Sequence, residues 1–258
     1  IVVDQNEALL YASAFLSLPR NMIIIKKNQE EANRLYEQMQ PLLAPNACLL
    51  FCVDESMRIE ALASSPELVS ERMFSMYHLT KPDAHVLITH SHALVRYIPS
   101  PAVFKQYCLA LEIGMHMDIY ALQEYAIRAG YQNTSRVDTP FYFSKRGGII
   151  DIYTAQYEYP IRIEFFDDEI EDLRLYDPAS QKTIDHIKEV TIIPASDILY
   201  EDTEVPALQQ ELQHIFDKQT IDPLYQATLQ AKLQEDILHL QEHDTSYYMY
   251  RYMGMFSG

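Results

Sequence analysis

The stretch YPIRIEFFDDEIEDL, residues Tyr159 to Leu173, alternates apolar and polar side chains with the period of a β-strand. One face of this strand is apolar and consists of Ile161, Ile163 and Phe165. The opposite face is mixed and consists of Arg162, Glu164 and Phe166. An ordinary half-buried strand of an antiparallel sheet explains the alternation. A phenyl ring gains nothing from water, however, so the mixed face also fits a surface on which another molecule docks. The alternation alone leaves both interpretations open.

The sequence on both sides of this stretch predicts a compact α+β module with an antiparallel sheet. A helix is expected over residues 118–131, with Asp118 as its N-cap and Gly130 just past its end. Four further strands are expected around the quoted one, over residues 141–145, 148–153, 172–176 and 189–194. The dipeptide Asp167–Asp168 falls in a turn, where Asp is simply a good turn residue.

The first hundred residues have a different pattern, in which short apolar strands alternate with helices. Helices are expected over 4–17, 28–44 and 66–79, and strands over 22–27, 48–53 and 84–89. Asn28 is the expected N-cap of the second helix. This alternation predicts a parallel α/β sheet covered on both faces. From Glu201 onward the chain is acidic and helical, and the Tyr- and Met-rich segment 246–256 is expected to form a core contact or an interface.

Composition limits the class of protein. The chain has 258 residues, of which 48% are hydrophobic, so we expect a globular protein with one large domain or two smaller ones. No apolar run approaches the roughly 18 residues of a membrane span, and no signal peptide is recognisable at the start. The chain lacks an initiator Met, so we expect it to be part of something longer. Three cysteines without a CxxC pair (Cys48, Cys52 and Cys108) favour a reducing, cytoplasmic location.

The net charge argues against nucleic-acid binding by the chain as a whole. It carries 37 acidic and 20 basic residues, a formal net charge of −17. Such a chain repels phosphate except at a local basic spot, and it favours cationic partner surfaces. The segment SKRGG, Ser144 to Gly148, is such a spot, where Gly147 and Gly148 can form a tight turn or bulge that aims Arg146 off the sheet edge. A plain hairpin turn with solvated charges explains it equally well.

No catalytic, cofactor or metal site is expected. A phosphate-binding loop needs glycines followed by Lys and Ser or Thr. None of the six glycines lies in the first hundred residues and none precedes a Lys, so we predict no nucleotide triphosphate site. The histidine pairs His90/His92 and His239/His243 lack a third ligand at motif spacing. No Ser, Cys or His arrangement resembles an activated nucleophile.

The segments KRGGIIDIY and YPIRIEFFDDEIEDLRLYDPASQKT resemble a signature shared by the bacterial transcription-repair coupling factors (Mfd) and the excinuclease subunit UvrB. The resemblance to the coupling factors is closer and covers nearly the whole chain. It implies an α/β protein in three parts. These are a degenerate RecA-like (P-loop NTPase-type) parallel-sheet domain at 1–112, an inserted α+β antiparallel-sheet domain at 113–196, and a mostly helical C-terminal return segment at 197–258.

The resemblance also implies a function. The chain would be a non-catalytic adaptor module whose inserted domain binds UvrA and so recruits it to a stalled RNA polymerase for nucleotide excision repair. The residues that would carry this contact are Arg146, Arg162, Glu164 and Phe166. We expect both arginines on one sheet face and Glu164 orienting one of them. RNA polymerase and DNA would be reached only through domains outside this chain.

The resemblance has departures and alternatives. Phe141 and Tyr142 replace a Gly-Glu pair, and Asn133 and Ser144 stand where relatives carry Arg, so Arg136 or Lys145 is expected to compensate. One alternative is a piece of a UvrB-like ATP-dependent DNA helicase. Another is a module that packs against the C-terminal regulatory domain of its own full-length chain and restrains it.

Overall fold

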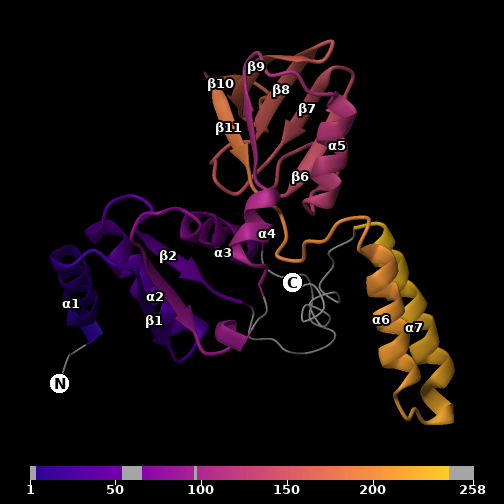
Figure 1. Cartoon of the computed structure of the whole chain (residues 1–258). Helices are drawn as coiled ribbons and strands as arrows, with labels where there is room; N and C mark the ends of the chain where they lie inside the picture. Colours follow the sequence, from indigo (N-terminus) through magenta and orange to yellow (C-terminus); the bar gives the residue numbers. More distant parts are fainter. Residues whose placement is uncertain (1–3, 54–65, 96–97, 244–258) are drawn as a thin grey trace. The chain divides into compact units, whose positions relative to one another are not determined.

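The computed structural model describes residues 4–53, 66–95 and 98–243 (Figure 1). Contacts between Cα atoms divide the chain into two compact units, Ile1–Arg96 and Tyr97–Gly258. The described residues contain both parallel and antiparallel sheets, so the predicted mixed α/β class is confirmed. No helix in this part of the chain has the length and apolar character needed to cross a membrane.

The first unit contains a parallel sheet with the strand order β1-β3-β2. Its strands are β1 (Met22–Lys26), β2 (Cys48–Phe51) and β3 (Val86–His90). Its helices are α1 (Asp4–Ser17), α2 (Gln29–Met39) and α3 (Pro66–Leu79), with short 3-10 turns η1 (Gln40–Leu42) and η2 (Ala93–Val95). The predicted parallel alternation of strands and helices is therefore confirmed for this unit.

Helix α2 packs against all three strands, and α1 packs against α2 (Figure 1). The shared core contains Phe15 of α1, Leu35 and Met39 of α2, and Ile24 and Ile88 of the sheet. The predicted N-cap is confirmed, because the side chain of Asn28 accepts a hydrogen bond from the backbone N–H of Glu31 (2.9 Å). These contacts fix α2 on one face of the sheet.

The prediction of a sheet covered on both faces holds only in part. All residues of β2 are buried, and α3 packs against this strand. Ile23 and Ile25 of the edge strand β1 are exposed, so the described helices cover only one face there.

The second unit contains a sheet in the order β10-β9-β8-β7-β6-β5, antiparallel except for the β5–β6 pair. Its strands are β5 (Gln132–Asn133), β6 (Tyr142–Arg146), β7 (Ile149–Ile152), β8 (Ile161–Phe166), β9 (Glu169–Tyr176) and β10 (Thr183–His186). A separate antiparallel pair joins β4 (Leu109–Glu112) to β11 (Glu189–Ile192). The sequence did not predict β4, β5, β10 or the short helix α4 (Pro101–Gln106).

Helix α5 (Ile119–Arg128) packs its buried side chains Leu122 and Ala126 into the core on one face of the six-stranded sheet. The fully buried sheet residues of this core are Phe143, Ile150, Ile152, Ile161, Ile163, Ile170 and Leu173. Asp118 caps the helix as predicted by accepting a hydrogen bond from the N–H of Tyr120 (2.8 Å). Gly130 follows the helix with φ +88°. The opposite face of the sheet, called the outer face below, carries no such helix among the described residues.

The pairing of β4 with β11 bears on the expected domain limits. Residues 109–112 were assigned to the first domain, whereas their strand partner is at 189–192 in the second unit. The expected limits at 112 and 196 stay predictions. The expected strand over 189–194 is confirmed, but it pairs with β4 and not with the six-stranded sheet.

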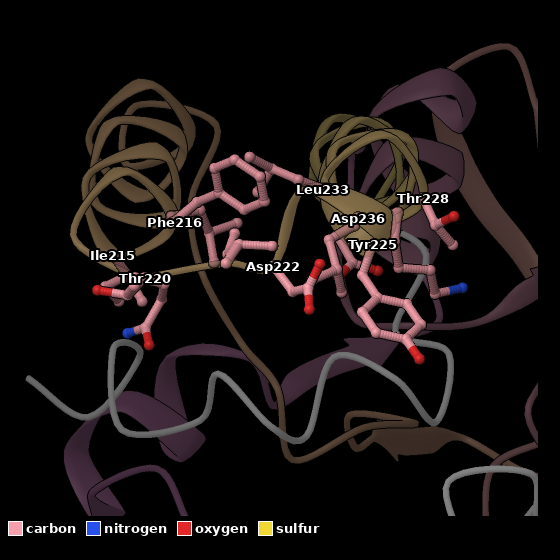
Figure 2. Close-up of a pocket in the computed structure, with 13 residues that line it drawn as sticks. Ile215, Phe216, Thr220, Asp222, Tyr225, Thr228, Leu233 and Asp236 are labelled. Atoms are coloured by element: carbon pink, nitrogen blue, oxygen red, sulfur yellow. The ribbon is translucent and has the colours of Figure 1, made fainter.

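Helices α6 (Val205–Asp217) and α7 (Pro223–Gln241) confirm the predicted helical character after Glu201. They form an αα-hairpin around a small apolar core. A cleft of about 560 Å³ lies between them, where Phe216 of α6 and Leu233 of α7 point toward one another (Figure 2). The predicted Tyr- and Met-rich contact at 246–256 lies outside the described residues.

Candidate functional site

Strand β8 shows the alternation that the sequence predicted. Ile161 and Ile163 are fully buried against α5 and its neighbours, while Arg162 and Glu164 lie on the outer face. An irregularity in the β8–β9 pairing skips Glu171 and pairs Phe165 with Ile170, so the alternation continues to the strand end. Phe166 is therefore on the outer face and is 73% exposed.

The β6–β7 hairpin places Arg146 on the same outer face. Gly147 adopts φ +59°, a backbone conformation that glycine tolerates best, in the two-residue turn between Arg146 and Ile149. A Cβ atom at Gly148 would lie only 3.0 Å from the carbonyl oxygen of Phe165. The N–H of Phe165 donates to the carbonyl of Gly148 (2.8 Å), so the hairpin is held closely against β8. The two glycines thus have separate roles, one in the turn and one in close packing.

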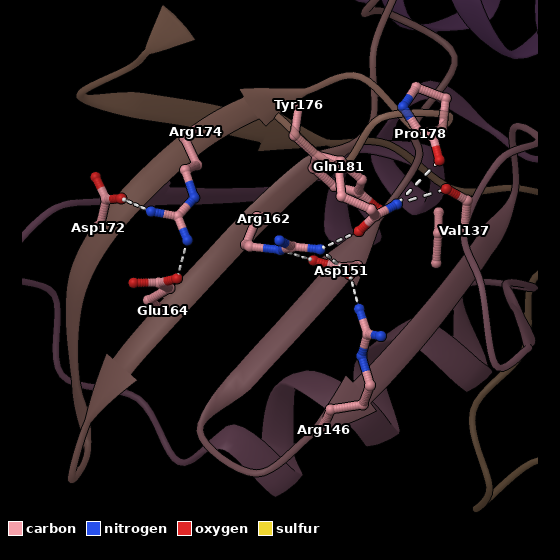
Figure 3. A network of polar contacts seen from close by, with 10 residues as sticks. All are labelled: Val137, Arg146, Asp151, Arg162, Glu164, Asp172, Arg174, Tyr176, Pro178 and Gln181. Carbon is pink, nitrogen blue, oxygen red and sulfur yellow. Dashed lines mark hydrogen bonds and ion pairs between the residues drawn. The ribbon is translucent and has the colours of Figure 1, made fainter. Parts of the chain in front are cut away.

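A single carboxylate, that of Asp151 on β7, binds both predicted arginines (Figure 3). Arg162 donates from Nε to Oδ1 (2.6 Å) and from Nη2 to Oδ2 (2.9 Å). Arg146 donates from Nη2 to Oδ2 (2.6 Å). The side chain of Asp151 is 1% exposed, that of Arg162 14% and that of Arg146 55%. The two arginines therefore share one buried counter-ion but differ strongly in their access to solvent.

Arg162 has two further contacts that fix its guanidinium plane. The guanidinium carbon lies 4.4 Å from the centre of the Tyr176 ring, and Nη2 donates to Oε1 of Gln181 (2.9 Å). The hydrogen bond to Asp151 is the main cause that raises the pKa of Arg162 above its ordinary value. Burial raises the pKa of the Tyr176 hydroxyl, and the Asp151 carboxylate adds to this effect. Arg162 is thus a permanently charged group packed on a neutral ring.

A second ion-pair group lies on the outer face beside the first (Figure 3). Arg174 of β9 donates to the carboxylates of Glu164 and, over 3.1 Å, of Asp172. Asp172 also contacts His186 Nδ1 (2.9 Å). The expectation that Glu164 orients Arg146 or Arg162 is therefore wrong, because its hydrogen bond goes to Arg174. Asp151 takes the role expected of Glu164.

The loop after β9 brings Gln181 to Arg162. Asp177 Oδ1 accepts a hydrogen bond from the N–H of Ser180 (2.6 Å), and this bond lowers the pKa of the Asp177 carboxyl. Gln181 has φ +61°, in the left-handed region. From outside the loop, Arg136 donates to the carbonyl of Pro178 (2.6 Å). The segment DPASQ, residues 177–181, is thus a closed turn whose last side chain reaches the arginine.

The residues that depart from the resembled family have defined positions. Ser144 is buried on β6 directly opposite Asp151, and Asn133 is exposed on the short strand β5. The ammonium group of Lys145 lies 4.1 Å over the ring of Tyr120 on α5. Lys145 therefore lies on the α5 face and not on the outer face with Arg146, and the compensation expected of it stays a prediction. Arg136 contacts the 177–181 turn, as described above. Phe141 precedes β6 with φ +73°, and Tyr142 begins that strand.

The histidines that could have suggested a metal serve other contacts. Nε2 of buried His90 accepts a hydrogen bond from the N–H of Val53 (3.2 Å). His243 contacts Asp202 (2.7 Å) and stacks on Tyr200. Within the described ranges, no group of three or more His, Cys, Asp or Glu side chains is placed to hold a metal ion.

Sequence reasoning missed the residues that organise this face, namely Asp151, Arg174, Tyr176 and Gln181. A signal for Asp151 existed in the strand IIDI, where the carboxylate falls on the face opposite Ile150 and Ile152. Pairing this strand with β8 in register would have placed it beside Arg162. The role of Gln181 depends on the turn geometry and has no comparable pattern.

Comparisons with known proteins agree with the resemblance that the sequence motifs suggested. Residues 109–198 match the family model described as UvrB interaction domain. Transcription-repair-coupling factors are similar to most of the chain. The Bacillus subtilis protein is 29% identical over 227 residues, covering 86% of this chain and 18% of that protein. The Myxococcus xanthus protein is 32% identical over 178 residues, covering 69% of this chain and 15% of that protein. The Staphylococcus haemolyticus protein is 29% identical over 211 residues, covering 82% of this chain and 18% of that protein.

The chain spans less than a fifth of the length of these relatives. The chain is thus similar over most of its length to the transcription-repair-coupling factors, and its residues 109–198 match the UvrB interaction domain.

Proposed function

We propose that this chain is a non-catalytic adaptor module of transcription-coupled repair, and that the outer face of its six-stranded sheet binds UvrA. The names of the relatives support a role in coupling transcription to repair. The match of residues 109–198 to a UvrB interaction domain supports a docking function for the second unit. UvrA as the partner rests on the motif resemblance, which assigns the contact to Arg146, Arg162, Glu164 and Phe166.

The observation that carries the proposal is Phe166. Its ring is 73% exposed at the end of a strand whose opposite face is closely packed. Arg162 lies on the same face of the same strand, and Arg146 shares its counter-ion Asp151. Exposed aromatic rings beside arginines are the composition of binding hot spots, because the ring contributes desolvated area and the guanidinium contributes oriented hydrogen bonds.

Charge also favours a protein partner. In a chain with net charge −17, all three arginines of the outer face are matched by carboxylates: Asp151 for Arg146 and Arg162, and Glu164 and Asp172 for Arg174. Such a face offers little net positive charge to nucleic-acid phosphates. It offers instead a pattern of fixed donors and acceptors that a protein surface can complement.

The first unit has a supporting role in this proposal. Its parallel sheet β1-β3-β2 with α2 on one face is compatible with a degenerate RecA-like domain. The absence of glycine from the first hundred residues supports the loss of nucleotide binding. RNA polymerase and DNA would be engaged by segments outside this chain, and a regulatory domain of the full-length protein would compete for the same outer face.

A direct binding experiment tests the proposal. Purified UvrA from the same bacterium is titrated into the purified chain in a calorimeter, at two salt concentrations. We expect saturable binding that weakens as salt rises, because guanidinium contacts are screened. UvrB added in excess should compete, since the resemblance implies a shared site. A chain that is folded by circular dichroism but does not bind UvrA at micromolar concentrations contradicts the proposal.

A further inference from the structure

Resting on the proposed function, we propose that Asp151 and Gln181 are positioning residues that preset Arg146 and Arg162 for partner binding. Neither residue is among those that the motif resemblance assigns to the contact. Asp151 is too buried to touch a partner. Gln181 is exposed, but both ends of its amide are already hydrogen-bonded within the chain, to Arg162 and to the Pro178 carbonyl. Both would therefore affect binding through the arginines.

The first step of the argument is the placement of Asp151. Its Cα is the direct cross-strand partner of the Arg162 Cα, and its carboxylate accepts three hydrogen bonds from two guanidinium groups. Burying a carboxylate to 1% exposure is costly unless such partners compensate its desolvation. Arg146, Arg162 and the Asp151 carboxylate therefore form one fixed unit, in which the position of each arginine depends on Asp151.

The second step is the backbone of Gln181. Its φ of +61° is a conformation in which glycine is favoured over residues with a Cβ. Gln181 nevertheless occupies the position, and both polar atoms of its side-chain amide form hydrogen bonds. Oε1 accepts from Arg162 (2.9 Å) and Nε2 donates to the Pro178 carbonyl (3.0 Å). The side chain thus links the 177–181 turn to the guanidinium of Arg162.

The third step is what this arrangement does for binding. An unrestrained arginine loses much rotamer freedom when a partner immobilises it, and this loss weakens association. Arg162 is held here by Asp151, Gln181 and the Tyr176 ring before any partner arrives. Arg146 is tethered through one N–H group and remains 55% exposed, so its other donors are available. The two positioning residues would therefore lower the entropic cost of docking.

Gln181→Gly tests the inference without straining the backbone. The variant removes the amide at a φ that glycine prefers, so the melting temperature should stay at or near that of the wild type. UvrA affinity should fall about threefold to tenfold, the effect of losing a hydrogen bond of ordinary strength. Asn46→Gly is the matched control, because Asn46 is an exposed amide residue of the first unit with φ +64°. It should change neither affinity nor melting temperature appreciably.

Asp151→Asn provides the second test, through a double-mutant cycle. The variant keeps the side-chain shape but loses the charge, and it should weaken UvrA binding roughly tenfold. If Asp151 acts through the arginines, this effect shrinks in the Arg146→Ala background and persists in the Phe166→Ala background. Full additivity with Arg146→Ala overturns the inference, as does wild-type affinity of Gln181→Gly.

NMR of the arginine side chains separates the inference from the proposed function, because it needs no partner. In the free protein, the Nε–H resonance of Arg162 should be protected from exchange, and Asp151→Asn should abolish this protection. If Arg162 is unprotected in the wild type, the positioning inference fails whatever UvrA does. If Arg162 is protected and UvrA still does not bind the wild type, the proposed function fails, and with it the positioning role in docking.

Discussion

Asp151 and Arg162 are direct cross-strand partners on β7 and β8, and their side chains pair through hydrogen bonds of 2.6 and 2.9 Å. This relationship separates the roles of the two arginines. Arg162 is 14% exposed and packed on Tyr176, so it supports the face as well as forming part of it. Arg146 shares the same carboxylate but is largely exposed. Substitutions of the two arginines should therefore have different effects on stability.

We expect Phe166→Ala to weaken UvrA binding by about 1–3 kcal/mol, roughly tenfold to a hundredfold. The ring is 73% exposed, so the free energy of unfolding should change by less than about 0.5 kcal/mol. Leu224→Ala is the matched control, since Leu224 is a similarly exposed apolar side chain that belongs to helix α7 and not to the sheet. Calorimetric titration and thermal melting of both variants check the prediction. Equal affinities of the two variants would place the docking surface elsewhere.

Arg146→Ala should also weaken UvrA binding by about 1–3 kcal/mol, because it removes an exposed guanidinium whose direction Asp151 sets. Its neighbour Lys145 provides the control, since its ammonium group lies over Tyr120 on the α5 face. Lys145→Ala removes the same formal charge from the adjacent residue, so a general electrostatic effect would act on both variants. The measurement is UvrA affinity at two salt concentrations. A comparable loss in both variants would mean that net charge, and not the outer face, governs binding.

Substitutions of core residues and of outer-face residues on β8 should lower the free energy of unfolding by different amounts. Ile163→Ala truncates a fully buried side chain and should cost about 2–5 kcal/mol. From strand alternation alone, Arg162→Ala would leave folding nearly intact. The structure changes this expectation, because the substitution removes two hydrogen bonds from a buried carboxylate that keeps only Arg146 as an arginine partner. We expect a cost of about 1–3 kcal/mol.

Urea unfolding of Ile163→Ala and Arg162→Ala measures the two losses in the free energy of unfolding. Phe166→Ala is the control variant, and its unfolding midpoint should equal that of the wild type. If Arg162→Ala unfolds at the wild-type midpoint, the ion pair with Asp151 contributes nothing to stability. If Ile163→Ala is as stable as the wild type, the two faces of β8 have been assigned the wrong way round.

Local sequence signals predicted the elements whose stability is local. Asn28 and Asp118 each cap the predicted helix with their own side chains, and the period-2 pattern of β8 gave both faces correctly. The strand pairing of β11 was not predictable in this way, because its partner β4 lies far away in the sequence and is only four residues long.

The sequence predicted which residues lie on the outer face better than it predicted the hydrogen bonds between them. The four candidate residues share the face, but their hydrogen bonds depend on which residues the register brings opposite them. Glu164 lies opposite Asp172 and bonds to Arg174, whereas Asp151 lies opposite Arg162. A single-strand pattern contains no such cross-strand information, which explains why Glu164 was assigned the role of Asp151.

The turn that follows Phe166 contains a contact whose contribution to stability should depend on pH. His116 Nδ1 lies 3.0 Å from Asp168 Oδ1, and this hydrogen bond is the main cause that raises the pKa of His116 above its ordinary value near 6.5. Since the folded pKa is raised, the contact stabilises the folded turn below the ordinary histidine pKa. This contribution is lost as the pH rises through the folded pKa.

An NMR titration of the His116 ring measures this shift. Asp168→Asn should return the pKa of His116 toward its ordinary value. Glu169→Gln is the comparison variant, because the Glu169 charge is a minor cause of the shift and its removal should lower the pKa by less. A His116 that titrates identically in the wild type and in Asp168→Asn shows that the contact is not formed in solution.

The chain should not bind ATP, and the connection between β1 and α2 gives the physical reason. Only Lys27 and Asn28 separate the strand from the helix, whereas a phosphate-binding loop needs a longer glycine-rich segment there. Asn28 already caps the helix N-terminus, and Glu30 and Glu31 in its first turn would repel phosphate.

The measurement is the fluorescence anisotropy of a labelled ATP analogue titrated with the chain in the presence of Mg²⁺, with an intact P-loop ATPase as the positive control. We expect no saturable binding up to high micromolar protein. Asn28→Ala, which removes the cap of α2, should not create ATP binding either. The carboxylates of Glu30 and Glu31 remain, and the chain has no lysine directly after a glycine. Micromolar binding that unlabelled ATP displaces would contradict the non-catalytic adaptor proposal and favour the UvrB-like enzyme instead.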